Sequence, residues 1–343
     1  MTKLHANCLN HEDTKTPRNT KIKMPKLSVV VLNWNGKTLL ADCLSSLSNQ
    51  TLTDLEVLLV DNGSSDGSVE YVKTEFPGIR VIALEKNLGF SAGNNRGIEA
   101  SSSEFVALFN NDAVADRQWA ERLLAPAADS KVGIVASKVM LFSERDRLDS
   151  AGDGMTIVGV AYKRGHLEPA DRYPATESVF GASGCAMLLR RSMLDDIGLL
   201  DEDFFLSYED SDVCFRAQLR AWKCVYASEA RVYHRLNSSI GRLSPRYVYY
   251  GQRNAEFLYF KNMPGWLMWK YFPAHLLNII LALAYFTGRG HCWTFIRSKI
   301  GFLKALPAVL SKRRQIQSRR TISCRDLDTL LEKRWLRTRL AGK

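Results

Sequence analysis

Residues 27–36 read LSVVVLNWNG, an unbroken apolar segment that stops at the polar cluster Asn33-Trp34-Asn35. Two later apolar segments end in the same way: Leu55–Val60 runs into Asp61-Asn62-Gly63, and Phe105–Phe109 runs into Asn110-Asn111-Asp112. Continuous apolar runs of this length are typical of buried parallel strands. Because the carboxyl ends of parallel strands share one edge of a sheet, we expect the three polar clusters to meet at one crevice.

Between these segments the hydrophobic period is that of a helix, as in the stripe Leu39, Leu40, Cys43, Leu44 and Leu47. Predicted strands cover 27–32, 55–60, 79–84, 105–109, 132–139, 186–189 and 224–226, with helices at 68–76, from 91, at 118–124 and after 210. Loops or short hairpins are expected between 141 and 179, where Gly and Pro recur. This alternation predicts an α/β fold with a doubly wound, mostly parallel, Rossmann-like sheet.

The basic charge is concentrated at the carboxyl end. Residues 289–343 hold 15 Lys or Arg against three acidic residues, a local charge of +12 in a chain of net charge +11. Residues 1–26 are polar and basic, which predicts a disordered tail and not a secretory signal. The seven cysteines form no C-x-x-C pair, which indicates reduced thiols and not a disulfide framework or a zinc cluster. Both features favour a cytoplasmic location.

A predicted helical segment, 241–343, contains an apolar stretch at 266–286 beside the basic tail. Polar residues and Pro273 interrupt this stretch, and its uninterrupted part is shorter than the about 20 residues that span a bilayer. We therefore expect a helix that lies in the membrane interface, with a buried core helix as the alternative. Interfacial aromatics and a basic tail suit an anionic membrane surface. The expected location is peripheral, on the inner face of the cell membrane.

Two turns at the predicted crevice contain small residues that let a ligand approach the backbone. Asp61, in the turn DNGSSDG, can accept hydrogen bonds from a nucleoside. Residues 87–97 open a helix whose free N–H groups, with Arg96, suit a diphosphate. The alternatives are an ordinary turn, and a helix start capped by Ser91 with a solvated Arg96. The sequence contains no G-x-x-x-x-G-K-[ST] phosphate loop.

Further positions suggest metal and base chemistry. Asp112 suits Mg²⁺ or Mn²⁺ as a ligand, and His234 could be a further ligand. The alternative for Asp112 is a helix cap, and the alternative for His234 is a structural histidine. Glu209 and Asp210 follow Ser207 in a capping-box-like pattern at a predicted helix start. A carboxylate there is stabilised as the anion and can take a proton from an alcohol, whereas the alternative is a capped helix with solvated acids.

In order and spacing, these segments resemble the family 2 inverting glycosyltransferases of the GT-A fold, especially rhamnosyltransferase-like members. The resemblance covers a proposed domain at 27–240. It is carried by SVVVLNWNG (28–36), VDNGSSDG (60–67), NLGFSAGNNRG (87–97), FNND (109–112), GASGCAMLLRR (181–191) and LDEDFFLSYEDSD (200–212). No single motif is specific, but their order and spacing together are.

The resemblance implies a role for each matching position. The implied substrate-binding residues are Asn33, Asn35, Asp61, Asn62, Asn87, Gly93, Arg96, Asn110 and Gly184, with Asp61 at the nucleoside. Asp112 would be the second acid of the family's D-x-D metal motif. Asn110 replaces the first acid, a departure that weakens metal affinity or leaves the ion held mainly by phosphate. Asp210 would be the general base with Glu209 as its neighbour, and His234 would help to bind the metal or the diphosphate.

We therefore expect an inverting glycosyltransferase that acts in cell-surface polysaccharide synthesis. It would move a sugar from a nucleotide-diphosphate donor, by resemblance dTDP-rhamnose, to a hydroxyl of a glycan or lipid-linked acceptor, with Mg²⁺ or Mn²⁺ as cofactor. The alternatives are a nucleotidyltransferase on the same sheet, and a non-catalytic sugar-nucleotide-binding or membrane-docking protein. No recognised nucleic-acid module accompanies the basic tail, so nucleic acid is not an expected partner.

Overall fold

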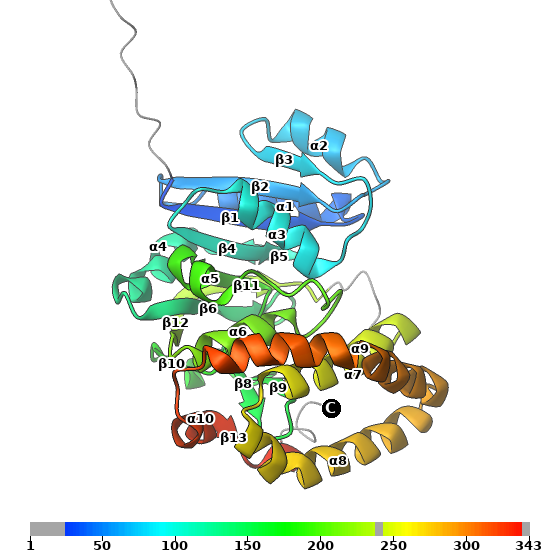
Figure 1. Ribbon diagram of the computed structural model, residues 1–343. Coiled ribbons are helices and arrows are strands. Elements are labelled where there is room, and N and C mark those ends of the chain that lie inside the picture. Colours follow the sequence, from blue (N-terminus) through cyan, green and yellow to red (C-terminus); the bar gives the residue numbers. More distant parts are fainter. Residues whose placement is uncertain (1–24, 237–242, 338–343) are drawn as a thin grey trace, which may run out of the picture.

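The computed structural model describes residues 25–236 and 243–337, so residues 1–24 of the predicted tail lie outside the described part (Figure 1). The central sheet contains β1 (Leu27–Asn33), β2 (Leu55–Asp61), β3 (Arg80–Ala83), β4 (Phe105–Asn110), β5 (Ala113–Ala115), β6 (Val132–Leu141), β7 (Leu148–Ala151), β10 (Glu177–Ser178), β11 (Ala186–Arg190) and β12 (Lys223–His234). The main path of this ten-stranded sheet is β10-β12-β6-β11-β4-β1-β2-β3, with β5 on β12 and β7 on β6.

Helices cover both faces of the sheet and form the carboxyl-terminal segment. They are α1 (Lys37–Ser48), α2 (Ser68–Glu75), α3 (Phe90–Ala100), α4 (Trp119–Leu124), α5 (Arg191–Ile197), α6 (Glu209–Leu219), α7 (Pro245–Asn262), α8 (Gly265–Thr287), α9 (Cys292–Ser318) and α10 (Cys324–Leu330), with short 3₁₀ turns at Ala125–Ala128 and Ala170–Arg172. Four of the five residues of the predicted stripe, Leu40, Cys43, Leu44 and Leu47, are buried against one face of the sheet, whereas Leu39 is half-buried.

The strands that carry the three polar clusters lie side by side in parallel, as predicted. β1 pairs with β2 and with β4, and the register places Asn33 beside Asp61 and Leu32 beside Asn110. β3 extends this parallel block beyond β2. The carboxyl ends of β1, β2 and β4 therefore share one edge of the sheet.

The other half of the sheet is less parallel than the sequence predicts. β11 runs antiparallel between β4 and β6, because the strand–helix alternation stops where the chain forms β7 and the hairpin β8 (Asp153–Thr156) and β9 (Ala161–Lys163). β12 also continues past the predicted 224–226, through an irregularity between Ala227 and Arg231. Its end pairs with β5, so that His234 lies opposite Ala113 and next to Asp112.

The carboxyl-terminal segment is helical, as predicted, and lies at the end of the molecule opposite β3 (Figure 1). α8 is continuous through Pro273, and only Leu267, His275 and Ala282 are buried in it, so the alternative of a buried core helix is wrong. Within the described ranges, α8 is the helix long and apolar enough to cross a membrane by those two criteria. β13 (Leu331–Glu332) joins β8 and β9 in a second small sheet, and the division near residue 240 stays a proposed boundary.

Candidate active site

The first cluster of polar side chains lies where β1, β2 and β4 end. Asn33 donates from Nδ2 to Asp61 Oδ1 at 3.0 Å and accepts at Oδ1 from Asn111 Nδ2 at 2.8 Å. Asp61 Oδ2 accepts from the N–H of Ser64 at 2.9 Å, and Ser64 Oγ accepts from the N–H of Asn35 at 2.8 Å. The structure thus brings Asn33, Asn35 and Asp61 together. Asn111 belongs to one of the predicted polar clusters, but no role of its own was predicted for it.

A second group of contacts shapes the turn before α3. Asn62 donates from Nδ2 to Asn87 Oδ1 at 3.2 Å and to the Gly89 carbonyl at 3.0 Å, and its N–H bonds to the Asn33 carbonyl at 2.8 Å. Gly93 is required for packing, because a Cβ there would lie 3.2 Å from Asn62 Nδ2 and even closer to a side chain of β1. Asn62, Asn87 and Gly93 therefore position backbone beside the first cluster.

Arg96 does not join these clusters. Its guanidinium lies 2.8 Å from Glu99 and 3.8 Å from Glu202, and 40% of its side chain is exposed. The alternative of a Ser91 cap is wrong, because Gly89 is the N-cap and the Ser91 hydroxyl donates to a distant carbonyl. Any contact between Arg96 and a diphosphate would require the side chain to leave two carboxylates.

Asp112 and His234 form a buried pair at the junction of β4, β5 and β12. Asp112 Oδ1 lies 3.2 Å from His234 Nε2. Burial lowers the pKa of His234, but its contacts with Cys185, Asp112 and Asp149 outweigh burial and raise this pKa well above its usual value. The helix-cap alternative for Asp112 is wrong, because α4 begins at Trp119 without a side-chain cap.

Asp149, on β7, was not anticipated from the sequence, since no pattern between 141 and 179 marks it. It is fully buried and lies 2.9 Å from His234 Nδ1, while Lys163 Nζ donates to both of its oxygens at 2.6 and 2.7 Å. Burial raises the pKa of Asp149, but hydrogen bonds from His166 and His234 and the charge of Lys163 outweigh it and lower that pKa. An anionic Asp149 therefore orients the imidazole so that Nε2 faces Asp112.

The Asp112–His234 pair fits a divalent cation that shares its ligands with a substrate. A carboxylate oxygen and an imidazole nitrogen face one another, and the raised pKa of His234 means that a bound cation would have to displace the proton from Nε2. Such cations are often held by one or two protein groups plus phosphate oxygens. Across residues 25–236 and 243–337, no set of three or more His, Cys, Asp or Glu side chains is arranged to hold a metal by itself. The donor set therefore favours a cation bound together with a diphosphate over a closed protein site.

Asp210 lies half-buried in the first turn of α6. Its Oδ2 accepts from the N–H of Gly184 at 3.0 Å, and its Oδ1 accepts from the N–H of Ser211 at 2.6 Å. The predicted capping box does not form, because Tyr208 is the N-cap and no side chain caps the helix. The backbone of Gly184 and not a capping interaction therefore orients the Asp210 carboxylate.

Glu209 lies in a different environment from its neighbour. Its side chain is buried, and its Oε2 lacks a hydrogen-bond partner among the residues that the structure describes. Burial and the charge of Asp210 raise the pKa of Glu209 well above its usual value. The same two causes raise the pKa of Asp153 to about 7. The pKa values of both carboxyl groups beside Asp210 are thus raised, which makes protonation easier than for an exposed acid.

The turn that leads into Glu209 is strained. Ser207 and Tyr208 have φ angles of 68° and 73°, in the left-handed region that such residues rarely adopt. Asn254, on α7, donates from Nδ2 to the carbonyls of Leu206 and Ser207, both at 2.9 Å. The carboxyl-terminal helices therefore fix the backbone just before the two acids.

The dipeptide Gly184-Cys185 links the surroundings of Asp210 to those of Asp112 and His234. Gly184 holds Asp210, while the carbonyl of the next residue, Cys185, accepts from the N–H of Asn110 at 2.9 Å. Asn110 enters the described hydrogen bonds through its backbone alone. The dipeptide Gly184-Cys185, just before β11, therefore contacts both the candidate base and the end of the strand that leads to Asp112. An accessible carboxylate near a carboxylate–imidazole pair can combine proton abstraction with stabilisation of a leaving anion.

Comparison with known proteins defines this class of enzyme as a glycosyltransferase. The profile of "Glycosyl transferase family 2" matches residues 28–198, and that of "Glycosyl transferase family group 2" matches residues 172–308. The chain belongs to glycosyl transferase family 2. This membership sets aside the nucleotidyltransferase alternative.

Among relatives, the N-acetylglucosaminyl-diphospho-decaprenol L-rhamnosyltransferase of Mycobacterium tuberculosis is 28% identical over 248 residues, 63% of this chain and 78% of its own. The putative glycosyltransferase EpsH of Bacillus subtilis is 32% identical over 127 residues, 36% of each chain.

Two solved structures show the same GT-A fold. A mannosyltransferase from Pyrobaculum calidifontis, in complex with GDP-Man and Mn²⁺, has a TM-score of 0.53 at 16% identity and covers 87% of this chain and 84% of its own. GalNAc-T7, with UDP, GalNAc and Mn²⁺, has a TM-score of 0.55 at 16% identity and covers 69% of this chain and 48% of its own.

Proposed function

We propose that this glycosyltransferase moves one sugar, with inversion, from a nucleotide-diphosphate donor to a hydroxyl of a lipid-linked glycan. The observation that carries the proposal is the placement of Asp210. Its carboxylate is half-buried, held by the N–H of Gly184, and separated from the environment of Asp112 and His234 by one dipeptide. An in-line displacement needs a base on the acceptor side and charge stabilisation on the leaving-group side.

Asp210 acts as the general base in this proposal. It takes the proton from the acceptor hydroxyl as that oxygen attacks the anomeric carbon from the face opposite the diphosphate. Glu209 is unsuited to the same task, because burial favours its neutral form. One base and one displacement invert the anomeric centre without a second carboxylate as nucleophile.

The donor binds, we propose, at the carboxyl ends of β1, β2 and β4, with the nucleoside near Asn33 and Asp61. Asp112 and His234 would hold a Mg²⁺ or Mn²⁺ ion, which when bound supplies positive charge to the departing diphosphate. The donors named for the two solved structures are consistent with a nucleotide-sugar donor here. Among such donors, dTDP-rhamnose is the first candidate, because one relative is named a rhamnosyltransferase.

The acceptor is proposed to be lipid-linked and the enzyme peripheral on the inner face of the cell membrane, in cell-surface polysaccharide synthesis. The name of the mycobacterial relative includes a diphospho-decaprenol carrier. α8 and α9 also expose large apolar side chains toward solvent, among them Trp266, Trp269 and Trp293. A basic segment beside such a surface suits anionic lipid.

The substitution Asp210→Asn tests the base. It keeps the size of the side chain and its hydrogen bond from Gly184 but removes the proton acceptor, so turnover should fall about 100-fold or more. Donor binding, measured by calorimetry with dTDP-rhamnose and Mn²⁺, should change little. Glu209→Gln is the matched comparison and should cost far less turnover. A near-wild-type rate for Asp210→Asn, or a larger loss for Glu209→Gln, would refute the assignment.

A further inference from the structure

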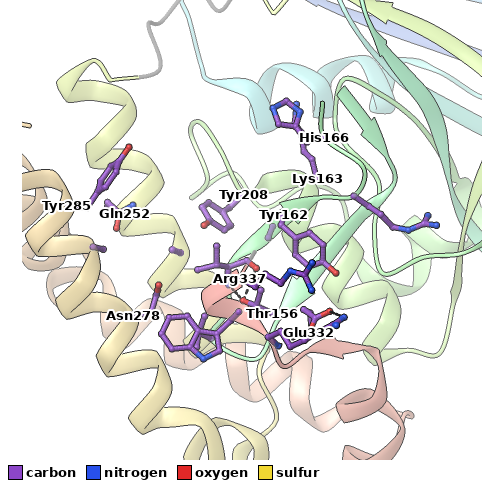
Figure 2. A pocket seen from close by; sticks show the side chains of 18 of the residues that line it. Thr156, Tyr162, Lys163, His166, Tyr208, Gln252, Asn278, Tyr285, Glu332 and Arg337 are labelled. Carbon is purple, nitrogen blue, oxygen red and sulfur yellow. Dashed lines mark hydrogen bonds and ion pairs between the residues drawn. The ribbon is translucent and has the colours of Figure 1, made fainter. Parts of the chain in front are cut away.

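A cavity of about 970 Å³ lies between the hairpin of β8 and β9 and helices α7, α8 and α9. Figure 2 shows Lys163 and Tyr162 on one side of it, Asn278 and Tyr285 of α8 on the other, and Tyr208 between them. Cavities of about 300–1,000 Å³ are typical of sites that enclose small ligands. This space is therefore large enough for a sugar, a diphosphate and the first units of an apolar chain.

The cavity extends to residues next to the candidate base and to one candidate cation ligand. Tyr208, which directly precedes Glu209 and Asp210, lines the cavity, as does His234, which faces Asp112. The residues at the ends of β1 and β2 do not line it. Asp210 itself does not line the cavity, so a ligand bound there would reach the candidate base past Tyr208, outside the proposed nucleoside site.

One part of the lining is cationic. Five Lys or Arg side chains border the cavity against three Glu, and three His border it as well. Lys163 uses two hydrogen bonds on Asp149, which leaves one N–H of its ammonium for a ligand. Arg337 makes no ion pair with the described residues, while Glu256 and Glu332 are already paired within the protein. Lys163, Arg164, Lys299 and Arg334 are each paired with a carboxylate as well. Arg337 and the third N–H of Lys163 are therefore the donors left for an anion such as a phosphate.

The opposite wall is apolar and comes from α8. The residues of α8 that line the cavity recur at helical spacing on one face: His275, Asn278, Ile279, Ala282, Tyr285 and Phe286. A second face of α8, which does not line the cavity, is exposed and apolar and contains Leu276, Leu277, Ile280 and Leu281. A single helix therefore separates the cavity from the surface that we propose faces lipid, and an apolar chain bound in the cavity stays beside the bilayer.

We propose that this cavity is the acceptor site and that it binds a prenyl-type carrier through both its phosphate and its apolar chain. The phosphate lies toward Lys163 and Arg337, the chain runs along Ile279, Ala282 and Phe286, and the sugar hydroxyl points to Asp210. This inference rests on the proposed function, since it names the acceptor class of the same reaction. The cationic and apolar walls match the two chemically different parts of such a carrier.

Farnesyl diphosphate is a water-soluble probe for this site. Calorimetry should show that it binds wild-type protein, and that Ala282→Trp, which fills the cavity, weakens binding about tenfold or more. Ile279→Trp provides a second filling variant in case the first does not fold. The control, Ile280→Trp, places the same side chain on the outer face and should change affinity less than about twofold. Arg337→Ala should weaken the binding of farnesyl diphosphate but not the binding of farnesol. Arg325→Ala, the control, should change the affinity for neither ligand.

Nucleotide binding separates the possible outcomes. Filling variants that still bind dTDP with Mn²⁺ are folded, and if they also keep wild-type affinity for farnesyl diphosphate the acceptor site is elsewhere. Displacement of farnesyl diphosphate by dTDP would place the probe in the donor site and overturn the inference. If wild-type protein binds the prenyl probe but no nucleotide sugar, the proposed function fails instead.

Discussion

The contacts of Asp149 determine which way the imidazole of His234 faces. The substitution Asp149→Asn keeps the volume but removes the negative charge that faces Nδ1, and it leaves Lys163 without its partner. Loss of such an orienting group typically weakens metal binding about 10–100-fold. We predict that Asp149→Asn loses Mn²⁺ affinity by this factor, as measured by paramagnetic resonance with dTDP present. Its affinity for dTDP without metal should not change.

Asp146→Asn, an exposed acid close to Asp149 in the sequence, is the matched control. It should leave Mn²⁺ affinity at the wild-type value. Equal Mn²⁺ affinity for Asp149→Asn and the control would show that His234 does not depend on Asp149 for its orientation.

Residues that follow a strand could be predicted as site residues, and residues placed by distant contacts could not. Asp61, Asp112 and Asp210 stand at the ends of apolar runs or at a helix start, where the sequence alone marks an edge of the sheet. Asp149 and Asn254 carry no such mark. They reach the site through the hairpin region and through α7, over contacts that span 85 and 47 residues.

At the scale of elements, α7 is held against the catalytic helix α6 by a buried cation. Lys261 Nζ lies 2.5 Å from Asp201 Oδ2 and 2.6 Å from Asp212 Oδ1, and its side chain is 2% exposed. Removing one partner of a buried ion pair costs about 3–5 kcal/mol. Asp201 keeps Lys312 and Asp212 keeps Arg216, so the lower end of this range, about 3 kcal/mol, applies to Lys261. We predict that Lys261→Met lowers the free energy of unfolding in urea by this amount.

An exposed pair supplies the control for Lys261. Lys223 and Asp129 lie 2.8 Å apart but are 51% and 44% exposed, so Lys223→Ala should change the free energy of unfolding by about 0–1 kcal/mol. Similar losses for the two variants would mean that Lys261 does not anchor α7 to α6.

Periodicity predicted the elements of the amino-terminal half well, and the predicted apolar helix at 266–286 matches α8, although its polar residues were not explained. Pro273 and the polar residues after it were read as interruptions of an apolar stretch. In the structure His275 is buried, its Nδ1 lies 2.9 Å from the Val158 carbonyl, and its Nε2 lies 2.9 Å from Glu256. A buried polar residue that is fully paired does not break a helix. Its partners come from β8–β9 and α7, which a local pattern cannot reveal.

At the scale of the whole molecule, large apolar side chains are exposed mainly on α8 and α9. The exposed ones on these two helices are Trp266, Trp269, Leu276, Leu277, Ile280, Leu281, Trp293, Ile296, Ile300, Leu303 and Leu310. Removing residues 289–343 is a poor test of membrane docking, because it would delete Phe302 and Val309, which pack with Phe257 in the core. Surface substitutions leave that core intact.

We therefore predict that the triple variant Trp266→Ser, Trp269→Ser and Trp293→Ser loses most of its binding to vesicles containing phosphatidylglycerol. These side chains are 71%, 67% and 65% exposed, so their replacement should not disturb folding. Interfacial tryptophans and buried apolar area drive such binding, and about tenfold weaker co-sedimentation is expected. Leu167→Ser with Leu330→Ser, which replaces exposed leucines that do not belong to α8 or α9, should bind as wild type does. If the triple variant still co-sediments fully while binding dTDP normally, this surface faces a protein or solvent and not lipid.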